Sequence, residues 1–235
     1  MEGLFSHVHD ATIRTLAVNG YEVRAVAGQV CCGALHAHAG LRDEARVLAR
    51  QNLAAFGSGD EPIVVNSAGC GAMLKEYAHL LDEEDAAAGD GVSFAARVKD
   101  VTELLAERGP RPGAPLDRRV AYDPPCHLLH AQRIAEPPHR VLAAIPVLRV
   151  ISTPDAAQCC GSAGLFTLLE PGMSRAVLTP KLASLRDAAP QIVATGNPGC
   201  LMQIGAALAA AGIAAQARHP VELLDESYQV AGYYA

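Results

Sequence analysis

The chain alternates short runs of branched apolar residues with longer segments in which apolar residues recur every three or four positions. The short runs are typical of buried strands, and the longer segments are typical of helices that cover a sheet. We expect strands over residues 21–26, 63–65, 119–122, 147–151, 192–195 and 214–218. We expect helices over residues 6–19, 41–56, 71–81, 128–144, 173–188 and 200–211. Strands that alternate with helices in this way indicate βα units around short parallel sheets, so the predicted fold class is α/β.

The chain also repeats itself, because two copies of one cysteine pattern follow each other. Cys31-Cys32-Gly33 reappears as Cys159-Cys160-Gly161, and each copy is followed by an apolar run that leads to Cys70 or Cys200. Cys70 follows Cys32 by 38 positions, and Cys200 follows Cys160 by 40 positions. We therefore expect two tandem modules related by a pseudo-twofold axis, over residues 1–108 and 118–235, with a Pro- and Gly-rich linker over residues 109–117.

The two modules are expected to differ at their starts. Cys126 lies 33 positions before Cys159, so the equivalent position in the first module would fall before Met1. The first module is therefore expected to lack its first strand and its first cysteine. The second module is expected to hold the complete ligand set.

The cysteines follow predicted strands, at the edge of the sheet where open parallel sheets bind their ligands. Glycines beside the cysteines allow the chain to turn sharply and to approach a bulky inorganic centre closely. The predicted metal ligands are the four cysteines of the second module and, as an incomplete set, the three of the first: Cys126, Cys159, Cys160 and Cys200, then Cys31, Cys32 and Cys70. No catalytic side chain is predicted.

Thiolate ligands of this kind suit either zinc or an iron–sulfur cluster. The chain lacks the Cys-x-x-Cys pairs that zinc sites commonly use, because Met73 and Gln203 stand three positions after Cys70 and Cys200. Adjacent cysteines can bind separate irons of one cluster, which favours iron–sulfur over zinc. A disulfide framework fits less well, since seven cysteines are an odd number and adjacent cysteines strain a mutual bridge.

The composition restricts the classes of partner. The net charge is −6 at pH 7 and the chain has no long basic run, which argues against nucleic acid as a partner. The low-charge stretch over residues 201–217 is too short, and too rich in Ala and Gly, for a membrane span. No signal-peptide pattern is present at the N-terminus, so a cytoplasmic protein with reduced thiols is expected. The acidic run over residues 82–85 is expected to form a solvated loop.

The motifs together resemble the cysteine-rich (CCG) domain family. The resemblance rests on the two Cys-Cys-Gly turns and on three further segments, Ser67-Ala68-Gly69-Cys70, Asp123-Pro124-Pro125-Cys126-His127 and Asn197-Pro198-Gly199-Cys200. It is closest to the C-terminal part of the iron–sulfur subunit of glycolate oxidase, with the lactate-utilisation iron–sulfur protein and the cysteine-rich subunit of heterodisulfide reductase as relatives. It covers essentially the whole chain, whereas the ferredoxin-like part of those longer subunits has no counterpart in this sequence. The heterodisulfide reductase pattern also adds a cysteine where this chain has Met73 and Gln203.

The resemblance implies an electron-transfer subunit that holds an iron–sulfur cluster, expected as [4Fe-4S]. A flavoprotein partner would oxidise glycolate or lactate, and this chain would pass the electrons towards a quinone or another carrier. A separate ferredoxin-like protein would supply the missing part, and contact with the inner face of the membrane would come through partners. Two alternatives stay open: a zinc-binding structural module that serves assembly, and a thiol or disulfide redox subunit similar to heterodisulfide reductase.

Four histidines lie close to the predicted ligands in the sequence: His36, His38, His127 and His130. A histidine in such a place could complete a metal site or carry a proton. A hydrogen bond to a ligand sulfur is the commoner role. We therefore predict that His127 and His36 support the ligands as hydrogen-bonding neighbours.

Overall fold

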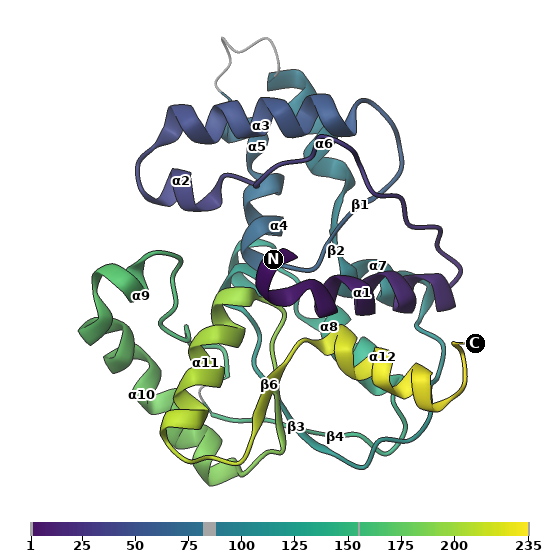
Figure 1. Cartoon of the computed structure of the whole chain (residues 1–235), viewed down its shortest axis with the longest axis vertical. Helices are drawn as coiled ribbons and strands as arrows, with labels where there is room; N and C mark the ends of the chain where they lie inside the picture. The colour runs from purple at the N-terminus through teal and green to yellow at the C-terminus, as the bar shows by residue number, and fades with distance from the viewer. Residues whose placement is uncertain (1, 82–87, 155, 235) are drawn as a thin grey trace.

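Two parallel sheets organise the chain (Figure 1). The computed structural model describes residues 2–81, 88–154 and 156–234, so the acidic run over residues 82–85 lies outside the described residues. In the smaller sheet, β1 (Ile63–Val65) pairs with β2 (Val98–Asp100). The larger sheet has the order β4-β3-β5-β6, with strands Arg149–Ile151, Arg119–Tyr122, Ile192–Ala194 and Gln216–Arg218. All four pairings are parallel, which confirms the predicted α/β class.

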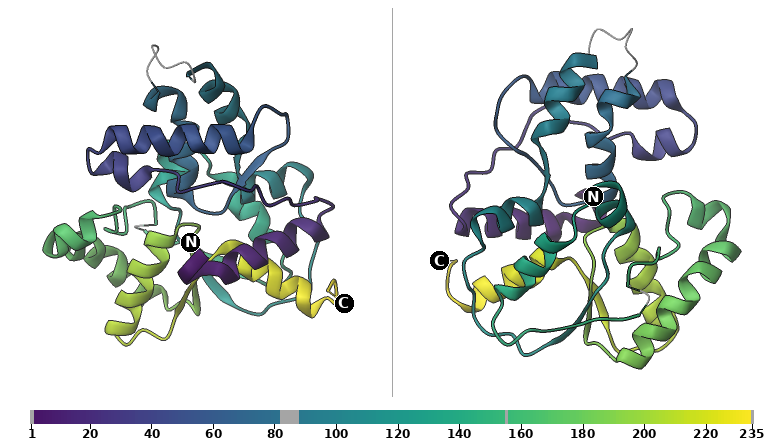
Figure 2. Two further views of the ribbon diagram at one scale, coloured as in Figure 1. Left: turned by 45° about the horizontal axis from the view of Figure 1, so that its top comes forward. Right: turned by 180° about the vertical axis from the view of Figure 1, so that it is seen from behind.

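Helices surround both sheets and connect their strands. Before β2 they are α1 (Glu2–Val18), α2 (Ala34–His38), α3 (Arg42–Phe56), α4 (Ala68–Lys75), α5 (Tyr77–Leu80) and α6 (Ala88–Arg97). After β2 they are α7 (Val101–Arg108), α8 (Glu136–Ala143), α9 (Phe166–Leu169), α10 (Pro171–Ala188), α11 (Pro198–Ala210), α12 (Pro220–Val230) and one π-helix (His127–Ala131). Seen from both sides, α10 lies on the side of α11 that faces away from α12 (Figure 2).

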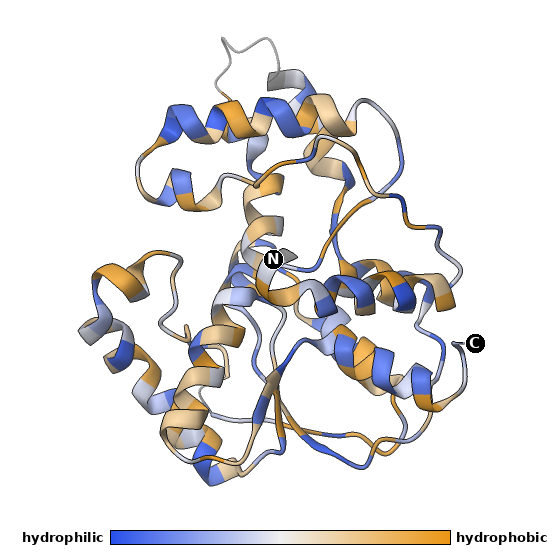
Figure 3. Ribbon diagram, in the orientation of Figure 1, coloured by the Kyte–Doolittle hydropathy of each residue, from blue (hydrophilic) through white to orange (hydrophobic). Residues whose placement is uncertain are grey.

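The largest hydrophobic cluster draws residues from both predicted modules. Helix α1 packs against α12, and both helices carry a mixture of hydrophobic and hydrophilic residues (Figure 3). Val8 and Leu16 of α1 are buried in one cluster with Val120 of β3 and Leu223 of α12. The guanidinium of Arg14 adds two hydrogen bonds to the Asp225 carboxylate, at 2.9 and 2.7 Å. The core is therefore continuous across the predicted linker, and the division into residues 1–108 and 118–235 stays a prediction.

One predicted strand is absent. Residues 21–26, all of which are described, follow α1 without regular structure. In the second module β4 pairs with β3, and the described part of the first module offers no strand equivalent to β3. A strand needs a neighbour for its ladder hydrogen bonds, so this segment forms no strand.

Two predicted helices are divided in the structure. The segment over residues 128–144 forms the π-helix and then α8, because Pro137 and Pro138 start a new helix and Arg133 has a positive φ of 58°. The segment over residues 71–81 becomes α4, which begins three residues earlier, and the short α5. Six of the described elements were not predicted: α2, α6, β2, α7, α9 and α12. Among the described residues, no helix is both long and apolar enough to cross a membrane.

Candidate metal centre

The four cysteines of the second module come together at the carboxyl edge of the larger sheet. Cys126 follows β3, Cys159 and Cys160 follow β4, and Cys200 lies in the first turn of α11, which follows β5. These three strands are neighbours in the sheet, so the segments after them meet. The Sγ atoms of Cys160 and Cys200 are 3.2 Å apart, and both residues are buried.

Hydrogen bonds between the thiols distribute the protons unevenly. Bonds from Cys126 and Cys160 lower the pKa of Cys159, and the Gly161 N–H, at 3.3 Å from the Cys159 Sγ, lowers it further. The bond with Cys159 raises the pKa of Cys126 and of Cys160 in turn. The neighbouring hydrogen-bond donors therefore converge on the Cys159 sulfur.

A partly buried ring of hydroxyl and amide groups holds the second Cys-Cys-Gly turn. Gly161 has a φ of +82°, which a side chain rarely adopts. The Ser174 hydroxyl, on α10, donates to the Gly161 carbonyl at 2.8 Å. Gln203 donates to Ser174 at 2.8 Å and accepts from Thr167 at 3.0 Å. Gln203 thus stands where the heterodisulfide reductase pattern has a cysteine, and its side chain fixes the turn.

The three cysteines of the first module form a smaller group. A hydrogen bond from Cys32 lowers the pKa of Cys70 to about 6, and the same bond raises the pKa of Cys32. Cys31 is exposed, and its carbonyl accepts from Asn52 at 3.2 Å. The Tyr77 hydroxyl donates to the Cys32 carbonyl at 3.0 Å. The structure therefore brings Cys32 and Cys70 together and leaves Cys31 at the surface.

The histidines divide into two groups. His127 lies 3.8 Å from the Cys126 Sγ through its Nδ1 atom and stacks on His38 with ring centroids 6.0 Å apart. Burial lowers the pKa of His127, and His38 lowers it further. His36 has a buried Nδ1 atom with no hydrogen-bond partner among the described residues, and His130 lies 3.4 Å from the Ala157 carbonyl. His127 is thus the histidine in contact with a cysteine of the larger group.

Two polar residues at this edge were not predicted as part of the site. The Asn197 side chain accepts a hydrogen bond from the Gly69 N–H at 3.0 Å and donates one to the Cys200 Sγ at 3.6 Å, so it joins the starts of α4 and α11. Lys181 of α10 forms a buried ion pair with Asp123. The motif around Cys200 already contained Asn197, but nothing in the sequence distinguishes Lys181 from a surface lysine.

The donor set fits a multi-sulfur centre. Within the described residues, no group of three or more His, Cys, Asp and Glu side chains has the arrangement of a single-ion site. The second module nevertheless gathers four thiols from three chain segments, and N–H groups of Gly161 and Asn197 point to two of the sulfurs. Soft thiolates with N–H donors directed at sulfur are what iron–sulfur clusters require of a protein.

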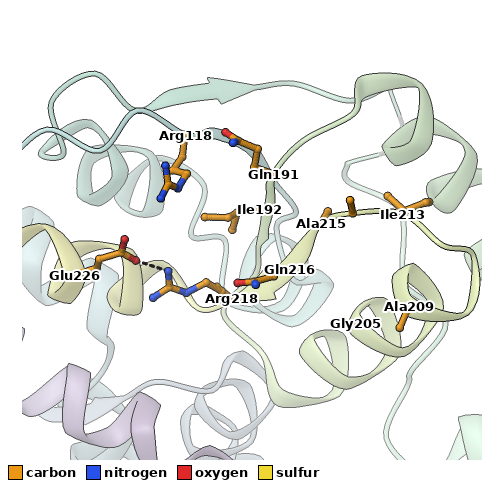
Figure 4. A pocket seen from close by; sticks show the side chains of 11 residues that line it. Arg118, Gln191, Ile192, Gly205, Ala209, Ile213, Ala215, Gln216, Arg218 and Glu226 are labelled. Atoms are coloured by element: carbon orange, nitrogen blue, oxygen red, sulfur yellow. Dashed lines mark hydrogen bonds and ion pairs between the residues drawn. The ribbon is translucent and has the colours of Figure 1, made fainter.

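A surface pocket of about 870 Å³ lies beside β6 and is separate from the cysteines (Figure 4). In Figure 4 Arg218 reaches Glu226 on one side, while Ala209 and Ile213 are on the other. Its lining includes no cysteine and no histidine. The candidate centre is therefore the cysteine edge.

A parallel α/β chain with cysteine turns after its strands defines a class of tandem cysteine-rich proteins. The model of the cysteine-rich domain, CCG, matches residues 1–75 and 120–205, and the chain belongs to this family. It is 31% identical, over 99% of its length, to a protein of Bacillus subtilis described as a probable glycolate oxidase iron–sulfur subunit, and covers 53% of that protein. It is 30% identical to the glycolate oxidase iron–sulfur subunit of Escherichia coli, with 96% of the chain matched to 55% of that subunit.

A third relative has a similar length. Lactate utilization protein A of Geobacillus kaustophilus is 28% identical over 94% of this chain and 93% of that protein. The chain therefore spans about half the length of the two glycolate oxidase subunits and nearly the whole of the lactate utilization protein.

Proposed function

We propose that this protein is an iron–sulfur electron-transfer subunit of a flavin-dependent 2-hydroxy acid dehydrogenase complex. The observation that carries the proposal is the meeting of Cys126, Cys159, Cys160 and Cys200 at one sheet edge, with Cys160 and Cys200 in sulfur contact at 3.2 Å. The names of the relatives, which are iron–sulfur subunits and a lactate utilization protein, indicate the kind of complex.

The proposed cluster, expected as [4Fe-4S], would accept and release single electrons. The protein's own part is to hold four thiolates and to adjust how readily the cluster is reduced. Burial of Cys160 and Cys200 keeps water from their sulfurs. Hydrogen bonds from the Gly161 N–H and the Asn197 side chain stabilise negative charge on sulfur, which favours the reduced state.

The chemistry on glycolate or lactate belongs, in this proposal, to a flavoprotein partner. Electrons would pass through the cysteine edge towards a quinone or another carrier, with a separate ferredoxin-like protein as a further partner. The complex would work in the cytoplasm, and contact with its partners would hold it at the inner face of the membrane. Cys31, Cys32 and Cys70 would bind a metal only with a donor from outside their own module.

Anaerobic purification followed by iron, sulfide and zinc analysis tests the proposal. We expect to find iron and sulfide together. We also expect a broad absorbance at about 400 nm, as iron–sulfur clusters give. The Cys126→Ser variant should lose most of the iron. The matched Cys31→Ser variant, at an exposed cysteine of the other module, should keep it.

Three results would contradict the proposal. Stoichiometric zinc without sulfide would point to a structural zinc module. A metal-free protein that reduces disulfides through Cys159 and Cys160, and keeps that activity in the Cys200→Ser variant, would point to direct thiol chemistry. Equal loss of iron in the Cys126→Ser and Cys31→Ser variants would remove the preference for the second module.

A further inference from the structure

Lys181 is a buried cation beside the cysteine edge. Its side chain is 1% exposed, although it lies on α10, an otherwise largely solvent-facing helix. Its ammonium group donates to the Asp123 carboxylate and, at 3.0 Å, to the Ala156 carbonyl. Removal of a charged group from water costs several kcal/mol, so a buried lysine indicates a specific structural or electrostatic role.

Asp123 and Ala156, both acceptors of Lys181, stand at equivalent places in two cysteine-bearing segments. Asp123 lies three residues before Cys126, and Ala156 lies three residues before Cys159. These segments leave the neighbouring strands β3 and β4. One ammonium group on α10 thus ties together the segments that carry three of the four cysteines.

The buried pair is also within electrostatic reach of the thiols. Burial raises the pKa of Asp123 to about 6, Lys181 opposes that rise, and the charge of Cys159 adds to it. Asp123 and Cys159 therefore interact electrostatically. The ammonium group lies beside both, because it contacts the Asp123 carboxylate and the Ala156 carbonyl, three residues before Cys159.

We propose that Lys181 is a positioning residue for the cluster of the second module and that its buried positive charge raises the reduction potential of that cluster. The inference rests on the proposed function. Reduction adds one negative charge to the cluster, and a nearby cation in a medium of low polarity stabilises that charge. Asp123 acts in the opposite direction, and it holds the ammonium group in place.

The test uses the whole protein, purified anaerobically, and a redox titration followed by EPR. The variants are Lys181→Met, Asp123→Asn and the double variant. The matched control is Lys99→Met, which breaks the partly exposed pair of Lys99 with Glu107. Iron content is measured first, so that only loaded protein enters the titration.

At an alkaline pH, at which the Asp123 carboxyl keeps its charge without Lys181, Lys181→Met should lower the reduced-to-oxidised ratio at a fixed potential about tenfold relative to wild type, which corresponds to about 59 mV for one electron. Asp123→Asn should raise the ratio, the double variant should return towards the starting value, and Lys99→Met should leave it unchanged. Opposite shifts of this kind follow from charge, and a merely structural role for the pair would not produce them.

The outcomes separate the two proposals. A wild-type protein without iron and sulfide contradicts the proposed function itself. Equal reduction potentials for cluster-loaded wild type and cluster-loaded Lys181→Met would overturn only the role of Lys181. If Lys181→Met does not retain the cluster, Asp123→Asn decides, because an unchanged or lowered potential in that variant overturns the inference.

Discussion

The two Cys-Cys-Gly turns offer a matched pair of glycines, because the same change should have different costs at Gly33 and Gly161. Both have a positive φ, +83° and +82°. An alanine at Gly33 would meet backbone atoms of Ala45 at 3.4 Å, which is ordinary contact. An alanine at Gly161 would overlap the carbonyl oxygen of Ser174, whose carbonyl carbon would lie at 3.2 Å.

The two costs can be worked out from these contacts. The left-handed backbone costs an alanine about 1–2 kcal/mol at either site. At Gly161 the overlap with α10 adds about 1–3 kcal/mol. Displacement of the Ser174 hydroxyl from the Gly161 carbonyl removes a hydrogen bond worth about 1 kcal/mol. We therefore expect Gly161→Ala to lower the free energy of unfolding by roughly 2–4 kcal/mol more than Gly33→Ala.

Urea unfolding of reduced, metal-free protein measures this difference without a contribution from cluster binding. Iron content after anaerobic purification should fall in Gly161→Ala and change little in Gly33→Ala. Free energies of unfolding within about 0.5 kcal/mol of each other would refute the reasoning, because the shared backbone cost would then be the whole effect.

Two further predictions concern stability away from the cysteines. Burial lowers the pKa of His219 from its ordinary value of 6.5 to about 3. The buried neutral imidazole therefore contributes fully to the free energy of unfolding above pH 6.5, and this contribution is lost as the pH falls from 6.5 towards 3. The His219→Asn variant keeps an acceptor for the Val221 N–H. Between about pH 7.5 and pH 5, the free energy of unfolding of the metal-free variant should fall by about 2 kcal/mol less than that of wild type. Equal falls for the two proteins in urea unfolding would contradict this. Arg14→Ala should lower the free energy of unfolding by about 1 kcal/mol, because it removes the partly exposed bidentate pair with Asp225 that joins α1 to α12; the effect should shrink in high salt, and a salt-independent loss in urea unfolding would contradict an ionic origin.

The sequence predicts those elements whose signal is local. The runs at β1 and β3 predict strands with the observed bounds, because a few branched apolar residues between turn residues are enough to identify a buried strand. The cysteines after β3, β4 and β5 are predicted to lie at one edge of the sheet, because parallel strands all end on the same side. The separate start of α8 has a local signal too, as Pro137 and Pro138 suit only the first turn of a helix.

Other features depend on partners that local sequence does not reveal. Residues 21–26 alternate as a strand would, yet they have no described neighbour to pair with. Lys181 lies in a polar helical segment like any surface lysine, and only the packing of α10 against the segments before Cys126 and Cys159 makes it a buried ion pair. Tertiary contacts decide both cases.

The structure fixes both cysteine turns through backbone carbonyls, and this leaves sulfur atoms available for a metal. In the second module the Ser174 hydroxyl bonds to the Gly161 carbonyl. In the first, the Tyr77 hydroxyl bonds to the Cys32 carbonyl. Neither contact uses a sulfur, so each turn can be formed before a metal binds, and the difference between the modules lies in the number of thiols that reach the edge. Four thiols come together in the second module and two in the first, where Cys31 is left at the surface, and among the described residues a buried cation lies beside only the larger group. These differences favour the second module as the proposed cluster site.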